Sequence, residues 1–273
     1  MPELPEVEVL RRSLVPHLTG RRLTSVEVRS PALREPLDRA ALGRLAGRRV
    51  TELRRRAKYL LIDVDSGDTL GVHLGMSGRL TVVSSEVPIA KHEHLSFSLS
   101  DGGRLRLEDP RRFGSAFVLS ADEIPVDRRF AHLGIEPLDG ELDGPYLRAR
   151  AAGRRGPIKS FLMDGRVVVG VGNIYASEVL WRTRVHPKRA VSRIGPETWH
   201  RLAETVRQVL ESAIAEGGTT LADFRDGEGS SGYFQVSLAA YGRDGEPCSR
   251  CTEPIRRLVQ SGRSTFYCPR CQR

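Results

Sequence analysis

The chain has 273 residues, of which 39% are hydrophobic, so it can form one large or two ordinary packed domains and is not disordered throughout. Its formal net charge is +9, with 43 lysines and arginines against 34 aspartates and glutamates, which indicates a nucleic-acid partner unless GC-rich coding alone has enriched arginine. No apolar run approaches the roughly 20 residues that span a bilayer and no signal peptide is visible, so we expect a cytoplasmic protein without a membrane partner.

The N-terminal half is predicted to be one helix followed by strands. Residues 2–18 combine first-turn prolines and glutamates with apolar side chains at three- and four-residue spacing. Short alternating runs with turn signals between them then favour an antiparallel sandwich or barrel, ending in a linker near residues 133–140. The predicted strands are 23–28, 49–53, 59–64, 69–74, 79–83, 94–99, 104–107 and 115–119.

The second half is predicted to be helical. Residues 173–183 open a helix directly after the glycine-rich run 169–172, and residues 196–216 form the clearest amphipathic pattern of the chain. Residues 226–232 are small, polar and rich in glycine, which is typical of a mobile loop. The glycine-rich run with Asn173 could let backbone amides approach an anion, or it could simply start a helix.

All four cysteines lie in the last part of the chain, as Cys248-Ser-Arg-Cys251 and Cys268-Pro-Arg-Cys271. Two CxxC pairs at this separation predict a four-cysteine zinc ribbon with one structural Zn²⁺ and no open coordination position. Redox pairs or free thiols are the alternative, but no thioredoxin-like pattern surrounds them. No organic cofactor is expected.

Two further stretches combine turn residues with side chains suited to DNA. Met76 lies in a glycine-rich bend, where it could fill the core or wedge between bases. Arg111 and Phe113 follow a turn at Asp109, where the alternative is a solvated loop with one buried Phe. The sequence has no P-loop, Ser-His-Asp signature or His-rich catalytic metal site.

Together these stretches resemble the bacterial formamidopyrimidine-DNA glycosylases, also called 8-oxoguanine DNA glycosylases. The resemblance runs from the first residue to the last in family order. The related endonuclease VIII proteins usually begin with Pro-Glu-Gly and lack the GVGNIYASE form. The matching segments are MPELPEVE, RRAKYLL, HLGMSG, KHEH, DPRRFG, HLGIEPL, IKSFLMDG, VVGVGNIYASE, GGTTLADF, GYFQ, YGRDGEPC and TFYCPRCQ.

The resemblance implies an α+β fold in three domains. Residues 1–134 form a catalytic N-terminal β-sandwich with a leading helix. Residues 135–240 form a helical, helix–two-turn–helix DNA-binding domain, and residues 241–273 form a zinc-finger β-hairpin. It also implies a monomeric, nucleoid-associated bacterial enzyme that binds damaged double-stranded DNA.

The implied activity is a bifunctional glycosylase and AP lyase that excises 8-oxoguanine opposite cytosine and formamidopyrimidines. Once Met1 is removed, the Pro2 amine, with an ordinary pKa of ~7.7–8.0, attacks the sugar as a covalent catalyst. Glu3 is implied as the proton donor and Glu6 as its support. Lys58 is implicated in β-elimination and Arg263 in δ-elimination, although either could be a simple phosphate clamp.

The resemblance also assigns DNA contacts and a capping loop. Residues 224–233 would cap the flipped base, although the loop lacks a proline common in the family, which bears on lesion preference. The alternatives are a pyrimidine-selective, endonuclease VIII-like glycosylase and a non-catalytic zinc-containing DNA-binding protein. The implied DNA-contacting residues are His73, Met76, His92, Arg111, Phe113, Arg154, Lys159 and Asn173.

Overall fold

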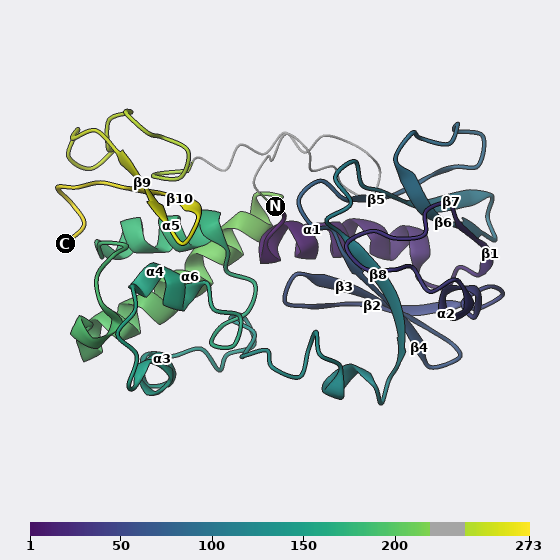
Figure 1. The fold of residues 1–273 in the computed structure, drawn as a ribbon, viewed down its shortest axis with the longest axis horizontal. Helices are drawn as coiled ribbons and strands as arrows, with labels where there is room; N and C mark the ends of the chain where they lie inside the picture. Colours follow the sequence, from purple (N-terminus) through teal and green to yellow (C-terminus); the bar gives the residue numbers. More distant parts are fainter. Residues whose placement is uncertain (219–237) are drawn as a thin grey trace. The chain divides into compact units, whose positions relative to one another are not determined.

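The computed structural model describes residues 1–218 and 238–273 (Figure 1). Contacts divide the chain into two compact units, with the boundary between Ala131 and His132. In the described part, the first unit holds residues 1–131 with 217–218, and the second holds 132–216 with 238–273. The predicted division into three domains stays a prediction, and the predicted mobile loop at 226–232 lies outside the described residues. No described helix is long and apolar enough to cross a membrane.

The first unit is built from two four-stranded antiparallel sheets, as the alternating runs predict. Leucine, valine and phenylalanine side chains from both sheets form one buried core, against which helix α1 packs. One sheet has the order β1 (Leu23–Val28), β6 (Glu93–Leu99), β7 (Gly103–Glu108) and β5 (Arg79–Ser84). The other has the order β2 (Val50–Arg56), β3 (Tyr59–Val64), β4 (Asp68–His73) and β8 (Ser115–Ser120), and the short helix α2 is Arg39–Gly43.

Helix α1 (Leu4–Leu18) begins two residues later than the sequence predicts. Glu3 has φ −106° and ψ −167°, so it is the extended N-cap rather than a helical residue. Its backbone amide donates to Glu6 Oε2 at 2.7 Å, and its side chain accepts from the backbone of Glu6, which completes a capping box. Pro2 therefore precedes the helix instead of opening it.

The second unit carries four α-helices and one β-hairpin in its described residues. The two longest helices lie close to the predicted positions, whereas α3 and α4 are short and carry no clear apolar period. The rings of Phe161 and Trp199 pack in a T-shaped arrangement, with 5.4 Å between centroids, which joins α4 to α6. The elements are α3 (Gly144–Ala151), α4 (Ile158–Leu162), α5 (Asn173–Thr183), α6 (Pro196–Ala215), β9 (Arg256–Gln260), β10 (Arg263–Tyr267), and the 3-10 turns Ile124–Val126 in the first unit and Val191–Arg193 in the second.

The segment predicted as a linker, residues 133–140, is partly packed rather than free. The Gly134 amide donates to the Gly165 carbonyl at 2.8 Å, and the Val169 amide donates to the Ile135 carbonyl at 3.1 Å. A Cβ on Gly134 would lie 2.3 Å from the Val167 carbonyl oxygen. The segment directly follows the boundary between the two units, in agreement with the prediction. Its packing could not be predicted because these backbone bonds, between residues far apart in sequence, leave no compositional signal.

Candidate functional site

The start of α1 buries two carboxylates beside the first proline. Pro2 is buried, Glu3 is 2% exposed and Glu6 is fully buried, whereas Met1 is exposed. The capping box fixes the backbone of Glu3, and the partial positive charge of the helix N-terminus favours carboxylates at this place. An acid is thereby held rigidly next to the position that becomes the N-terminus when Met1 is removed.

Lys58 lies in the two-residue turn between β2 and β3. Arg56 pairs with Tyr59, so Ala57 and Lys58 alone make the reversal. Ala57 has φ 54°, a left-handed conformation that costs an alanine about 1–2 kcal/mol. Such a residue persists where its surroundings hold it in place.

His73, at the end of β4, is a neutral hydrogen-bond donor. Its Nδ1 accepts from the Gly75 amide at 3.0 Å, which leaves the proton on Nε2. Burial, followed by the charges of Lys58 and Arg34, lowers its pKa to about 4. At neutral pH it can therefore donate from Nε2 to a phosphate oxygen without carrying charge.

Asp109 organises the two loops that carry the predicted wedge residues. Its side chain is fully buried and accepts from Ser77 Oγ at 2.6 Å and from the Gly114 amide at 2.7 Å. Its carbonyl oxygen lies 2.9 Å from Nε2 of the buried His94. The sequence predicts a turn at Asp109 but not its role as the buried acceptor that joins the two loops.

The same two loops are interlocked by their glycines. Gly75 has φ +61°, and a Cβ there would lie 2.3 Å from the carbonyl carbon of Phe113. Met76 is 40% exposed and Phe113 is 46% exposed, which weighs against core roles for both. The Arg111 guanidinium lies 4.7 Å from the centre of the Phe113 ring.

His92 belongs to the same corner of the first unit. Its carbonyl oxygen accepts from the Asp109 amide at 3.0 Å, and its side chain is half-buried. The fold therefore gathers five of the predicted DNA-contacting residues within or directly beside the loops held by Asp109. They are His73, Met76, His92, Arg111 and Phe113.

In the second unit, Lys159 and Asn173 fasten the β9–β10 hairpin to the helices. Lys159 is 2% exposed, and its ammonium donates to Asn173 Oδ1 at 2.6 Å and to Thr265 Oγ1 at 2.7 Å. Asn173 Nδ2 donates to the Ser264 carbonyl at 2.9 Å. These bonds fix Ser264 and Thr265, the two residues of β10 that follow the exposed Arg263. Contact of Lys159 and Asn173 with DNA stays a prediction. Their hydrogen bonds show that both residues also fix the hairpin to the helices.

Glu178 on α5 is a second residue that the sequence prediction missed. Its carboxylate is 4% exposed and accepts from the backbone amides of Ala239, Ala240 and Tyr241 at 2.8–2.9 Å. The chain that leads into the cysteine segment is thereby fixed on α5. A glutamate inside a helix gives no sequence signal for such a partner.

The four cysteines form the zinc site that the spacing predicts. The Sγ atoms of Cys248, Cys251, Cys268 and Cys271 lie within 4.8 Å of one another. Burial, together with sulfur contacts to Cys251 and Cys268, raises the pKa of Cys271 to about 12. At Cys248, burial acts in the same direction, but backbone hydrogen bonds outweigh it and lower the pKa to about 7. Four thiolates at this spacing require a cation, and an all-sulfur tetrad fits one structural Zn²⁺.

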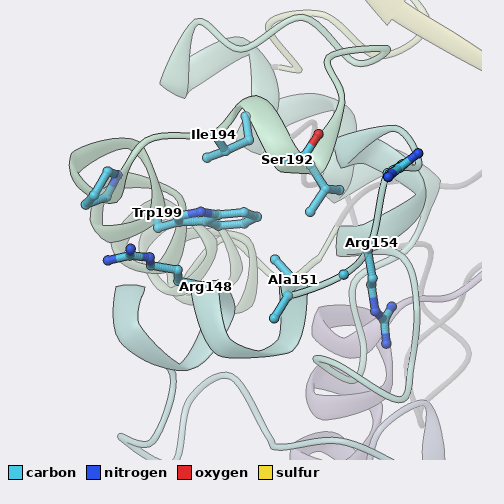
Figure 2. Close-up of a pocket in the computed structure, with 11 residues that line it drawn as sticks. Arg148, Ala151, Arg154, Ser192, Ile194 and Trp199 are labelled. Atoms are coloured by element: carbon cyan, nitrogen blue, oxygen red, sulfur yellow. The ribbon is translucent and has the colours of Figure 1, made fainter.

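Arg154 lines a pocket of about 450 Å³ between α3 and the start of α6 (Figure 2). Its guanidinium pairs with Asp164 at 2.9 Å. Burial favours the neutral form of Asp164, but hydrogen bonds from Arg166 and Arg154 outweigh this and lower its pKa to about 2. Ala151, Ile194 and Trp199 contribute apolar surface to the pocket, as Figure 2 shows.

Comparison with known proteins covers the whole chain. Residues 1–116 match the formamidopyrimidine-DNA glycosylase N-terminal domain, residues 133–225 match the H2TH domain of the same proteins, and residues 245–273 match the zinc finger found in FPG and IleRS. The chain is 48% identical over 274 residues to the formamidopyrimidine-DNA glycosylase of Acidithiobacillus ferrooxidans, and 50% identical over 275 residues to that of Thioalkalivibrio sulfidiphilus. Both matches cover 100% of each chain.

Solved structures agree with these relatives. The MutM (Fpg) protein of Thermus thermophilus matches with a TM-score of 0.89 and 38% identity over 99% of this chain and 98% of that one. The Lactococcus lactis Fpg, in a complex with DNA that contains an abasic site, matches with a TM-score of 0.91 and 32% identity over 99% of both chains. On its sequence, its fold and its cysteine tetrad, the chain belongs to the formamidopyrimidine-DNA glycosylase family.

Proposed function

We propose that this chain is a monomeric base-excision repair glycosylase and AP lyase that removes 8-oxoguanine opposite cytosine and formamidopyrimidines from damaged double-stranded DNA. The observation that carries the proposal is the buried first turn of α1, which holds Glu3 beside Pro2, in a chain that matches named glycosylases over its full length. A cytoplasmic, nucleoid-associated location stays a prediction.

Pro2 is the proposed nucleophile. Removal of Met1 frees its secondary amine, of which a useful fraction is neutral near pH 7.5 because an α-amino pKa is ~7.7–8.0. The nitrogen attacks C1′, the N–C1′ bond forms, and the bond from C1′ to the damaged base breaks, with its electron pair and a proton going to the base. Glu3 donates a proton to the ring oxygen as the sugar opens, which leaves an iminium.

The lyase steps follow from this iminium. It acidifies the C2′ hydrogen, whose removal expels the 3′ phosphate in β-elimination, and a second elimination expels the 5′ phosphate. We assign the first elimination to Lys58 and the second to Arg263. Together with burial, the charge of Lys58 lowers the pKa of His73, so the two side chains lie near each other, and the neutral Nε2–H of His73 can bind a flanking phosphate beside Lys58 without competing for a proton.

The lesion must leave the base stack to reach Pro2. We propose that Met76 and Phe113 fill the vacated space and that Arg111 contacts the orphaned cytosine. The exposure of the two apolar side chains on interlocked loops supports this. Residues 1–134 would then hold Pro2, Glu3 and Lys58, while 135–240 and 241–273 would bind the duplex and Arg263 of the last segment would assist the second elimination. The proposed capping loop, 224–233, lies outside the described residues. Every other residue named in the scheme is described.

Borohydride trapping tests the proposal. Purified protein, with its N-terminus confirmed as proline by intact mass, is incubated with a duplex containing 8-oxoguanine opposite cytosine and then reduced. We expect a covalent adduct on the N-terminal peptide of the wild type and none with undamaged duplex. Pro2→Gly, whose terminal amine is primary and can still attack, should lose turnover more than DNA binding, and equal losses in both would count against Pro2 as the nucleophile. Absence of the adduct indicates a non-catalytic DNA-binding protein, and faster cleavage at thymine glycol than at 8-oxoguanine indicates a pyrimidine-selective enzyme.

A further inference from the structure

Glu8, on helix α1, lies at the centre of a cluster of arginines. The side chain is 8% exposed and has no place in the chemistry proposed above. Arg11 binds both of its carboxylate oxygens, at 2.7 and 3.0 Å, and Arg12 Nε donates at 2.8 Å. Arg55, from β2, completes the cluster, with Nε 3.4 Å from Oε2. One buried carboxylate thus contacts three guanidinium groups.

Two of these arginines extend the cluster to the neighbouring strand and turn. Arg11 Nη1 donates to the Leu53 carbonyl of β2 at 3.2 Å. Arg55 Nη1 donates to the Ala57 carbonyl at 3.0 Å, within the turn that holds Lys58. Glu8 is therefore connected through Arg55 to the residue immediately before Lys58.

That turn needs an external constraint. Ala57 adopts a left-handed φ of 54° that alanine does not favour, so the turn conformation depends on contacts such as the bond from Arg55. Burial alone pushes the pKa of Glu8 upward, but hydrogen bonds from Arg11 and Arg12 outweigh it and lower the pKa to about 2. The carboxylate therefore keeps its charge throughout the physiological pH range.

The connection from Glu8 to Arg55 links the two elements that hold the amines of the proposed reaction, those of Pro2 and Lys58. Glu8 lies on the helix that begins just after Pro2 and Glu3, and Arg55 lies three residues before Lys58. We propose that Glu8 is a positioning residue that fixes Lys58 relative to the N-terminal amine by holding Arg55 against the Ala57–Lys58 turn. The inference rests on the proposed role of Lys58 in β-elimination.

The test compares two single-turnover rates on one duplex containing 8-oxoguanine. Base release is measured as strand breaks after treatment with alkali, and the enzyme's own strand cleavage is measured without alkali. The ratio of cleavage to release cancels any loss of active protein, which a purely structural defect would cause. We expect Glu8→Gln to lower this ratio about 10-fold, since a shift of about 1 Å in a reacting group can cost up to 100-fold. Glu8→Asp, which retains the charge, should restore most of the ratio.

Two further variants sharpen the result. Arg55→Lys keeps the positive charge but loses the planar fork that reaches both Glu8 and the Ala57 carbonyl, so it should lower the ratio as well. Glu86→Gln removes the same charge from an exposed position just after β5, away from the cluster, and should leave the ratio within about 2-fold. This pair keeps the test decisive if Glu8→Gln folds poorly.

Lys58→Ala separates the failure of this inference from the failure of the proposed function. If Lys58→Ala lowers the ratio while Glu8→Gln and Arg55→Lys leave it unchanged, the positioning role of Glu8 is overturned. If Lys58→Ala itself leaves the ratio unchanged, the assignment of Lys58 fails, and with it the basis for the role of Glu8. A reduction of the ratio in all three variants, with Glu8→Asp and Glu86→Gln near the wild-type value, supports the inference.

Discussion

The cysteine tetrad and the Asp109 corner, which comprises Asp109 and the two loops that carry Met76 and Phe113, both hold exposed segments in place. They do so with opposite arrangements of charge. The tetrad gathers four negatively ionisable sulfurs that together call for a positive charge, whereas Asp109 places one negative charge among donors, including Ser77 Oγ and the Gly114 amide. The cysteine tetrad requires ligands at fixed spacing and can therefore be predicted from the sequence. The Asp109 corner requires only one aspartate, since the backbone supplies most of its partners. A metal centre is therefore easier to predict than an equally central hydrogen-bonded carboxylate.

Removal of zinc should produce the largest effect. Structural zinc contributes roughly 10–16 kcal/mol in isolated zinc-finger peptides, so chelation should abolish hydrogen-exchange protection of β9 and β10 and weaken DNA binding through Arg263. Strands of the first unit serve as the internal control and should keep their protection. Unchanged DNA affinity after verified zinc loss would contradict the proposed contact by the hairpin.

Gly75→Ala tests the interlocking of the two loops at the Asp109 corner. The left-handed φ costs about 1–2 kcal/mol, and overpacking against the Phe113 backbone adds about 1–3 kcal/mol of lost stability. Gly20→Ala is the matched control because Gly20 also has a positive φ, but its Cβ would meet open space. Equal losses in urea unfolding for the two variants would show that the loops do not constrain each other.

Asp109→Asn tests the carboxylate itself. The amide keeps the shape but lacks the charge and turns an NH₂ group toward Ser77 Oγ or the Gly114 amide, so we expect a loss of about 1.5–3 kcal/mol. Asp122→Asn, at an exposed position, provides the control and should change the free energy of unfolding by less than about 0.5 kcal/mol. Similar stability for both variants would remove Asp109 from its central role.

His73 gives the smallest effect at neutral pH and a directional one in acid. Its folded pKa of about 4 lies below its ordinary value of 6.5, so the unfolded chain binds the proton more readily. The free energy of unfolding of the wild type, relative to His73→Asn, should be constant above pH 6.5 and fall as the pH decreases from 6.5 to 4. A difference that does not vary over this window would contradict a half-buried imidazole that is neutral in the folded protein.

Local patterns predicted the strands of the first unit well, because alternating apolar residues and turn signals fix both period and position. They also predicted the cysteine tetrad and helices α5 and α6. They could not show that Glu3 caps α1 instead of belonging to it, since that depends on one hydrogen bond to Glu6. They also missed Glu178, whose partners lie more than 60 residues away along the chain.

Lys159 shows the same limit at the level of a single side chain. By residue type it suggests a surface contact with phosphate, and the resemblance supports that interpretation. Its burial beneath β10 arises from Thr265, which approaches from 106 positions further along the chain. Site residues carried over from a family are therefore predictions of location, and the packing around each one decides what else it does.

The shared core beneath the cysteines has a consequence for protein engineering. Trp181 of α5 packs with Cys248, Ile255 and Cys268 in one buried cluster, and the guanidinium of Arg250 stacks 3.8 Å from the Trp181 ring. Helix α5 thus supplies part of the buried core of the C-terminal segment. It cannot be transplanted as a self-contained cassette, and a graft onto another scaffold would have to bring the end of α5 with it.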